Sequence, residues 1–201
     1  MSNGKAKGSE FERHISKTLS KWWSKNERED LFWRTQNSGG RFTVRQKKGF
    51  DTHHQGGDIC DIHPDGKLFF DVFCIECKSY KDIGLWSIVT GLGLLVEWWK
   101  KLEEMGVQEG KHPILITKSN NKPILFFTTD YIGSLLEEIC SVRPVFSTKL
   151  GICEDVCAFK LTDILSLDVD KFKQLCLSLQ ERCNIYESSG NQESTLCDSK
   201  A

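Results

Sequence analysis

The stretch Phe69-Phe70-Asp71-Val72-Phe73-Cys74-Ile75-Glu76-Cys77-Lys78 decides how this 201-residue chain is read. Its first seven residues are rich in Phe, Val and Ile, a composition typical of a buried central strand. Charges placed at the end of such a strand need a partner or a function, because burying an unpaired charge is costly. Glu76 and Lys78 are therefore the first candidates for a functional site.

A third charged residue precedes this stretch in a pattern that predicts a β-hairpin. We expect one strand over 58–63, a turn at 64–67, where Pro and Gly preset the dihedral angles, and a returning strand over 68–78. Pairing through this turn brings Asp58 back beside the region 74–76. The hairpin therefore predicts that Asp58 lies next to the Glu-x-Lys pair.

Two carboxylates beside an ammonium group point to metal-assisted chemistry. Residues 76 and 78 face the same side of a strand, so Glu76 and Asp58 can share a hard cation such as Mg²⁺, with Mn²⁺ expected to substitute. The backbone carbonyl of Cys77 is a further candidate ligand. Such a metal polarises a phosphodiester and activates water, and Lys78 can orient that water or stabilise the transition state. A Glu-x-Lys pair alone is more often a surface ion pair worth about 0–1 kcal/mol.

Glu12 is the candidate for a third catalytic carboxylate. We predict a helix from Ser9 to about Ser24, and Glu12 falls on its apolar face, which also contains Phe11, Ile15, Leu19, Trp22 and Trp23. The alternative is structural, because Ser9 and Glu12 have the spacing of a capping box. Both interpretations stay open from the sequence.

The remaining pattern predicts an α/β domain. A strand is expected over 31–35 and a polar loop over 36–57. Helices are expected over 82–105, 130–140, 162–167 and 169–183, and strands over 114–117, 124–128 and 156–160. This order indicates a central mixed β-sheet with helices on both faces. We expect a flexible N-terminus over 1–8, one domain over 9–186 and a disordered tail over 187–201.

Basic residues concentrate in the first quarter of the chain, although the net charge is only −1. Residues 1–50 contain twelve Lys and Arg but five Asp and Glu, which suits contact with phosphates over a limited surface or, equally, a solvated surface. The candidate DNA-binding residues in this region are Gln36, Ser38, Arg41, Arg45, Lys47 and Lys48. His53 and His54 are more easily explained as solvated loop residues.

The nine cysteines do not indicate a disulfide-bonded secreted protein. Their number is odd, and neither a signal peptide nor a transmembrane span is recognisable, so we expect reduced thiols in a cytosol-like compartment. Cys74 and Cys77 have CxxC spacing, but residues three apart on a strand point to opposite faces. A zinc site or redox pair there is not expected.

Four segments together resemble a known family. They are 7–13 (Lys-Gly-Ser-Glu-Phe-Glu-Arg), 38–41 (Ser-Gly-Gly-Arg), 57–59 (Gly-Asp-Ile) and 75–78 (Ile-Glu-Cys-Lys). In this order they resemble the archaeal-type Holliday junction resolvases and related phage enzymes of the PD-(D/E)XK superfamily. The resemblance covers residues 7 to about 82. Gly57 departs from it, standing where the superfamily name has proline.

The resemblance implies a restriction-endonuclease-like fold and a magnesium-dependent DNA endonuclease. It places the catalytic residues at Glu12, Asp58, Glu76 and Lys78, and a loop serine at Ser38. It also implies branched DNA as substrate and a homodimer, because resolving a four-way junction needs two symmetric cuts. The tryptophan-rich helix 82–105 is the candidate interface, unless C-terminal helices cover it. The alternatives are a restriction- or repair-type nuclease on duplex or flapped DNA, and an inert DNA-binding protein that kept the fold.

Overall fold

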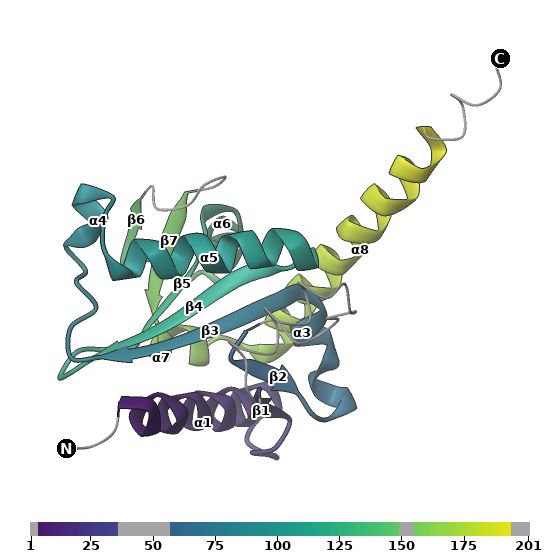
Figure 1. Ribbon diagram of the computed structural model, residues 1–201. Coiled ribbons are helices and arrows are strands. Elements are labelled where there is room, and N and C mark those ends of the chain that lie inside the picture. The colour runs from purple at the N-terminus through teal and green to yellow at the C-terminus, as the bar shows by residue number, and fades with distance from the viewer. Residues whose placement is uncertain (1–3, 36–56, 149–154, 194–201) are drawn as a thin grey trace, which may run out of the picture.

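A five-stranded mixed sheet forms the centre of the protein, as expected from the sequence (Figure 1). The computed structural model describes residues 4–35, 57–148 and 155–193. The strand order is β3 (Phe73–Tyr80), β4 (His112–Ser119), β5 (Leu125–Thr129), β7 (Val156–Lys160) and β6 (Phe146–Thr148). β3 pairs with β4 in parallel, and the other neighbours are antiparallel. Within this sheet β3 is therefore an edge strand.

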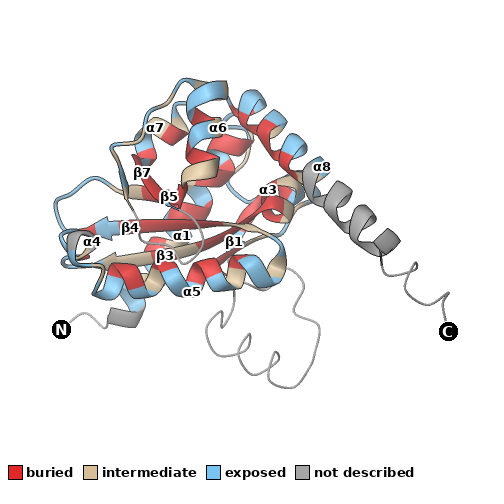
Figure 2. Ribbon diagram, turned by 90° about the horizontal axis from the view of Figure 1, so that it is seen from above, coloured by how far each residue is buried: buried red, intermediate tan, exposed pale blue. Residues whose placement is uncertain are grey.

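Helices cover both faces of this sheet, which makes the fold α/β and restriction-endonuclease-like. One face packs against α5 (Leu94–Glu109), and the other packs against α1 (Gly4–Trp23), α3 (Lys67–Val72), α6 (Asp130–Cys140), α7 (Leu161–Leu165) and α8 (Val169–Glu193). The strands are buried between these layers, while the outer sides of the helices are exposed (Figure 2). Neighbouring residues alternate between the layers: Leu115 lies in the α5 core, and Ile114 and Ile116 lie in the other core.

The predicted returning strand over 68–78 is wrong in its first half. Residues Lys67–Val72 form α3, which follows a 3₁₀ turn at Pro64–Gly66, and only then does β3 begin. A short apolar run fits a buried helix as well as a buried strand. Here Phe69 packs edge-on against Trp23, with ring centroids 5.1 Å apart, and the ion pair of Lys67 with Asp71 has helical i, i+4 spacing.

The predicted hairpin partner is also wrong. β2 (Ile59–Asp61) pairs with β1 (Phe32–Arg34) in a separate two-stranded antiparallel sheet, with Arg34 opposite Ile59. The expected strand over 31–35 is thus confirmed, but it is this strand, and not the one that contains residues 73–78, that pairs with β2. Asp58 nevertheless lies beside β3, for the reason given with the site below.

α1 begins at Gly4 rather than at Ser9, so Ser9 is inside the helix and is not its N-cap. The predicted apolar face is confirmed, since Phe11, Ile15, Leu19 and Trp23 are all buried. The later helix 130–140 is confirmed as α6, and Thr129 is its N-cap. The expected tail over 187–201 overlaps α8, which runs to Glu193, and residues 194–201 lie outside the described part of the chain.

The expected helix over 82–105 divides into two. α4 (Ser87–Thr90) is a single turn, and α5 begins at Leu94 after Gly91 and Gly93, whose φ angles are +67° and +114°. These left-handed conformations interrupt a helix. Trp99 is fully buried in the α5 core, whereas Trp86 is 86% exposed and is not covered by the C-terminal helices.

Candidate active site

Backbone hydrogen bonds fix Asp58 between the two sheets. Its N–H donates to the carbonyl of Ile75 on β3 (2.7 Å), and its own carbonyl accepts from the N–H of Thr35, just after β1 (2.9 Å). Its side chain also binds β3, because Oδ2 accepts from the N–H of Cys77 (2.9 Å). Asp58 is therefore held at the free edge of β3 without any hairpin.

Gly57 is required for this contact. Its φ is +90°, and a Cβ built at this position would lie 2.4 Å from the carbonyl oxygen of Ile75. Proline fixes φ near −65°, so it cannot adopt this conformation. The glycine that replaces the proline of the superfamily name thus allows the backbone to approach β3 closely enough for Asp58 to bind there.

The predicted meeting of three charged groups is present. The Nζ atom of Lys78 contacts the Oε1 atom of Glu76 and lies 3.6 Å from the Oδ2 atom of Asp58. Side-chain exposure is 8% for Asp58, 22% for Glu76 and 23% for Lys78. Two carboxylates therefore share one ammonium group in a largely buried site with some opening to solvent.

The charge imbalance changes the acidity of these groups. Burial and, after it, the charge of Asp58 raise the pKa of the Glu76 carboxyl to about 7, because Lys78 only partly opposes the rise. Burial lowers the pKa of Lys78, but the charges of Glu76 and Asp58 outweigh burial, and the net shift is upward. Burial and the same two carboxylates hold the pKa of the Cys77 thiol well above its usual value, so this thiol stays protonated. The site has an excess of negative charge that its own lysine does not neutralise.

Glu12 faces this site and does not close a capping box. Its Oε2 accepts from the Nε of Arg34 (2.9 Å), and its charge also contributes to the raised pKa of Glu76. The sequence analysis missed Arg34. A signal was available, because Arg34 is two residues from the apolar Phe32 on the same strand and therefore shares its inward face, where a charge needs a partner or a function. The remaining guanidinium N–H groups suit phosphate recognition.

The donor set fits a hard divalent cation that keeps other ligands. Among the described residues, no group of three or more His, Cys, Asp or Glu side chains is arranged to hold a metal alone. Mg²⁺ is commonly bound through one or two carboxylates with water and phosphate oxygens completing its shell. The N–H of Cys77 points to Asp58, and the N–H and C=O of one residue in an extended strand point the same way. The Cys77 carbonyl therefore also lies on this free edge, beside the two carboxylates.

Several candidate residues cannot be placed. Gln36, Ser38, Arg41, Arg45, Lys47 and Lys48 fall in 36–56, outside the described residues, as do His53 and His54. The CxxC pair can be placed, and its two side chains are separated as predicted: Cys74 packs in the α5 core and Cys77 in the opposite core. Both thiols are free. Within the described ranges, no helix is long and apolar enough to cross a bilayer.

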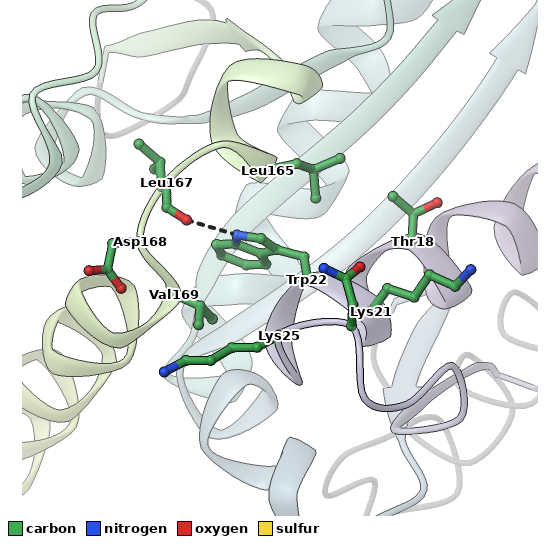
Figure 3. Close-up of a pocket in the computed structure, with 9 residues that line it drawn as sticks. Thr18, Lys21, Trp22, Lys25, Leu165, Leu167, Asp168 and Val169 are labelled. Carbon is green, nitrogen blue, oxygen red and sulfur yellow. Dashed lines mark hydrogen bonds between the residues drawn. The ribbon is translucent and has the colours of Figure 1, made fainter.

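A surface pocket lies apart from these residues, between α1 and the α7–α8 connection (Figure 3). It is lined by Thr18, Lys21, Trp22, Lys25, Asn26, Leu165, Leu167, Asp168 and Val169, none of which belongs to the charged site. Two of its polar groups already have partners within the protein: Lys25 pairs with Asp170 (2.6 Å), and the indole N–H of Trp22 donates to the carbonyl of Leu167 (3.2 Å). We therefore assign this pocket no ligand.

Asp58, Glu76 and Lys78 thus converge at a strand edge of an α/β fold. The family model described as phage putative PDDEXK endonuclease matches residues 3–178, which is most of the chain. The chain belongs to this family, and hence to the PD-(D/E)XK nucleases, which generally use divalent metal ions. No curated protein and no solved structure matches it.

Proposed function

We propose that the chain is a magnesium-dependent DNA endonuclease with Glu12, Asp58, Glu76 and Lys78 as its catalytic residues. The observation that carries this proposal is the shared contact of Lys78 with the two carboxylates at the free edge of β3. An inert DNA-binding protein has no need to keep a buried two-to-one charge imbalance, which raises the pKa of Glu76. The complete set of charges therefore favours a working enzyme.

Asp58, Glu76 and the Cys77 carbonyl would hold the metal ion, which is Mg²⁺ in this proposal, with Mn²⁺ as a substitute. A bound divalent ion supplies charge stabilisation for the phosphodiester and lowers the pKa of a bound water. Asp58 is positioned for this role by its two hydrogen bonds to β3, so it needs little rearrangement.

Lys78 is the residue that acts on the reacting groups directly. Its raised pKa keeps the ammonium charged at neutral pH. A charged Lys78 can orient the attacking water and stabilise the extra negative charge on the phosphoryl oxygens as the water oxygen bonds to phosphorus and the P–O bond to the leaving strand breaks. The Glu12–Arg34 pair borders the site, and its guanidinium is suited to hold a neighbouring phosphate.

The substrate in this proposal is DNA, and branched DNA is the finer hypothesis. It follows from the resemblance of residues 7–82 to junction resolvases, and it requires a homodimer with two active sites. The nuclease domain would span 9–186, and residues 36–48 would contact the phosphate backbone of the DNA. A restriction- or repair-type nuclease on duplex or flapped DNA is the alternative within the same chemistry.

One gel experiment tests the proposal. The protein is incubated with a four-way junction, a flap and a continuous duplex of matched sequence, with Mg²⁺ or with EDTA. We expect Mg²⁺-dependent cleavage of at least one substrate, and retained binding without cleavage for Glu76→Gln. Cleavage that survives in Glu76→Gln or in EDTA would reject this site. Light scattering of the protein alone and on the junction tests the dimer, and a strict monomer would remove the resolvase hypothesis only.

A further inference from the structure

Several exposed apolar side chains follow the strand that carries the active site. Five large apolar residues that follow Lys78 in the sequence are between 39% and 86% exposed: Tyr80, Leu85, Trp86, Leu92 and Leu94. They lie at the end of β3, in the connection through α4, and at the start of α5 (Figure 1). Scattered single residues of this kind need no explanation, so the informative one is Tyr80, which lies on the active-site strand itself.

Strand geometry places one of these residues on the same face as the catalytic groups. Side chains of a strand alternate, so Tyr80 shares its face with Lys78 and Glu76. At about 3.3 Å per residue, the Cα of Tyr80 lies about 7 Å beyond that of Lys78. A DNA strand advances about 3.4 Å per nucleotide along the duplex axis, so this separation corresponds to roughly two base steps.

The Tyr80 ring is already supported by a second aromatic ring. Its centroid lies 4.8 Å from that of Trp98 on α5, and the two planes are inclined by 46°. Trp98 is half-buried, and the adjacent Trp99 is fully buried against the sheet, which anchors this part of α5. Tyr80 itself is 46% exposed, so part of it remains accessible to solvent beside Trp98.

The stretch around this pair carries a small excess of positive charge. Lys81, Lys100 and Lys101 are exposed in the same stretch, whereas Asp82 and Glu97 are its only acidic residues between 79 and 101. Aromatic rings interleaved with cations are the usual means of holding unpaired nucleotides, since every base has a π-face that can stack. A second protein chain seated on Tyr80 would instead occupy the space beside Lys78 where the substrate strand must lie.

We propose that Tyr80 and Trp98 form a stacking platform for an unpaired base of the substrate, about two nucleotides from the cleaved phosphate. The platform selects DNA with an unstacked nucleotide near the cut, such as a flap or branch point, over continuous duplex. This inference rests on the proposed nuclease function and names its substrate class. Tyr80 and Trp98 act in it as specificity-determining residues and do not touch the reacting atoms.

The test measures binding in EDTA, so that it does not depend on cleavage. Fluorescence anisotropy compares a flapped duplex with a continuous duplex for the wild-type protein, Tyr80→Ala, Tyr80→Phe and the matched surface control Leu177→Ala. We expect Tyr80→Ala to weaken flap binding by about tenfold, within the range for loss of one base stack, and to change duplex binding less than twofold. Tyr80→Phe retains stacking and should bind the flap as wild type does, and so should Leu177→Ala.

A second binding experiment uses flapped substrates that each contain one abasic nucleotide. This nucleotide is placed in turn at each of the first four positions on either side of the point where the flap leaves the duplex. For the wild-type protein, an abasic nucleotide at one of these positions should weaken flap binding as much as Tyr80→Ala does. Tyr80→Ala should bind that abasic substrate no more weakly than it binds the intact flap. The platform would be overturned if the abasic nucleotide and Tyr80→Ala weakened binding independently, so that their fold-changes multiplied. Equal weakening of flap and duplex binding by Tyr80→Ala would also overturn it. Conversion of a wild-type dimer to a monomer by Tyr80→Ala, seen by light scattering, would also overturn it and make this surface a self-association interface. Absence of cleavage of any substrate in Mg²⁺ would overturn the nuclease function instead.

Discussion

Two groups of buried charges flank the same sheet, and they differ in balance. Near the end of α5, Glu109 and Lys111 form a pair 3.2 Å apart, each with a side chain 9% exposed. At the free edge of β3, Asp58 and Glu76 share Lys78, and these side chains are up to 23% exposed. The first pair is neutral and closed to solvent. The second carries excess negative charge and is partly open, which is what a site that takes up a cation requires.

The largest expected difference between the two groups is in cleavage. Asp58→Asn and Glu76→Gln should each reduce Mg²⁺-dependent cleavage by about a thousandfold or more, because the metal contributes several kcal/mol to the transition state. Glu109→Gln should cut at the wild-type rate per folded molecule. A plasmid-nicking assay with all three variants measures this. Normal nicking by Glu76→Gln would show that the β3 group is structural, like the Glu109–Lys111 pair.

The second difference is in stability, and it runs the other way. Glu109→Gln leaves Lys111 buried without its counter-charge and should lower the free energy of unfolding by about 3 kcal/mol. Glu76→Gln should cost little or nothing without metal, because it relieves repulsion with Asp58 and Lys78 keeps Asp58 as a partner. Urea unfolding in EDTA compares the two variants. An equal loss in both would contradict the distinction between a balanced and an unbalanced group.

The residues of the unbalanced group were available from the sequence, but the way the fold brings them together was not. Local parity on β3 predicted that Glu76 and Lys78 share a face, and this required only an extended backbone. The approach of Asp58 was predicted through a hairpin that does not exist. The short run over 67–72, in which four of six residues are apolar, does not distinguish the strand expected there from α3, since the packing of Phe69 against Trp23 decides between them. The Arg34 contact with Glu12 also depends on tertiary placement.

A substitution at Gly57 would displace Asp58 from β3 without changing any charge of the active-site group. Gly57→Ala introduces a Cβ 2.4 Å from the Ile75 carbonyl at a φ of +90°, so the Asp58 backbone must leave β3. We expect a loss of about 2 kcal/mol in unfolding free energy, together with weaker Mn²⁺ binding. The matched control is Gly133→Ala, whose Cβ would overlap the Sγ of Cys157 at 2.2 Å, away from the site. That variant should lose stability but keep the metal affinity of the folded protein, and weaker Mn²⁺ binding in both would remove the specific role of Gly57.

The smallest expected effect is a pH dependence of metal affinity. The pKa of Glu76 is raised from 4.5 to about 7, so its proton must leave before the carboxylate binds a metal. Mn²⁺ affinity should therefore rise about tenfold per pH unit below 7 and level off above it. Without metal the sign reverses: the raised pKa favours the protonated folded state, so the contribution of Glu76 to stability falls as pH rises from 4.5 to about 7. An affinity that is flat between about pH 5.5 and 7 would contradict the raised pKa.

The most direct test of the central claim is calorimetric titration of Mn²⁺ at about pH 8, where Glu76 is ionised. The charge imbalance at β3 predicts binding in the wild-type protein that is abolished in Asp58→Asn and in Glu76→Gln. The same binding should be unchanged in Glu109→Gln, which alters only the balanced pair. Undiminished binding in both Asp58→Asn and Glu76→Gln, or no binding in the wild-type protein, would contradict the assignment of this group as the metal site.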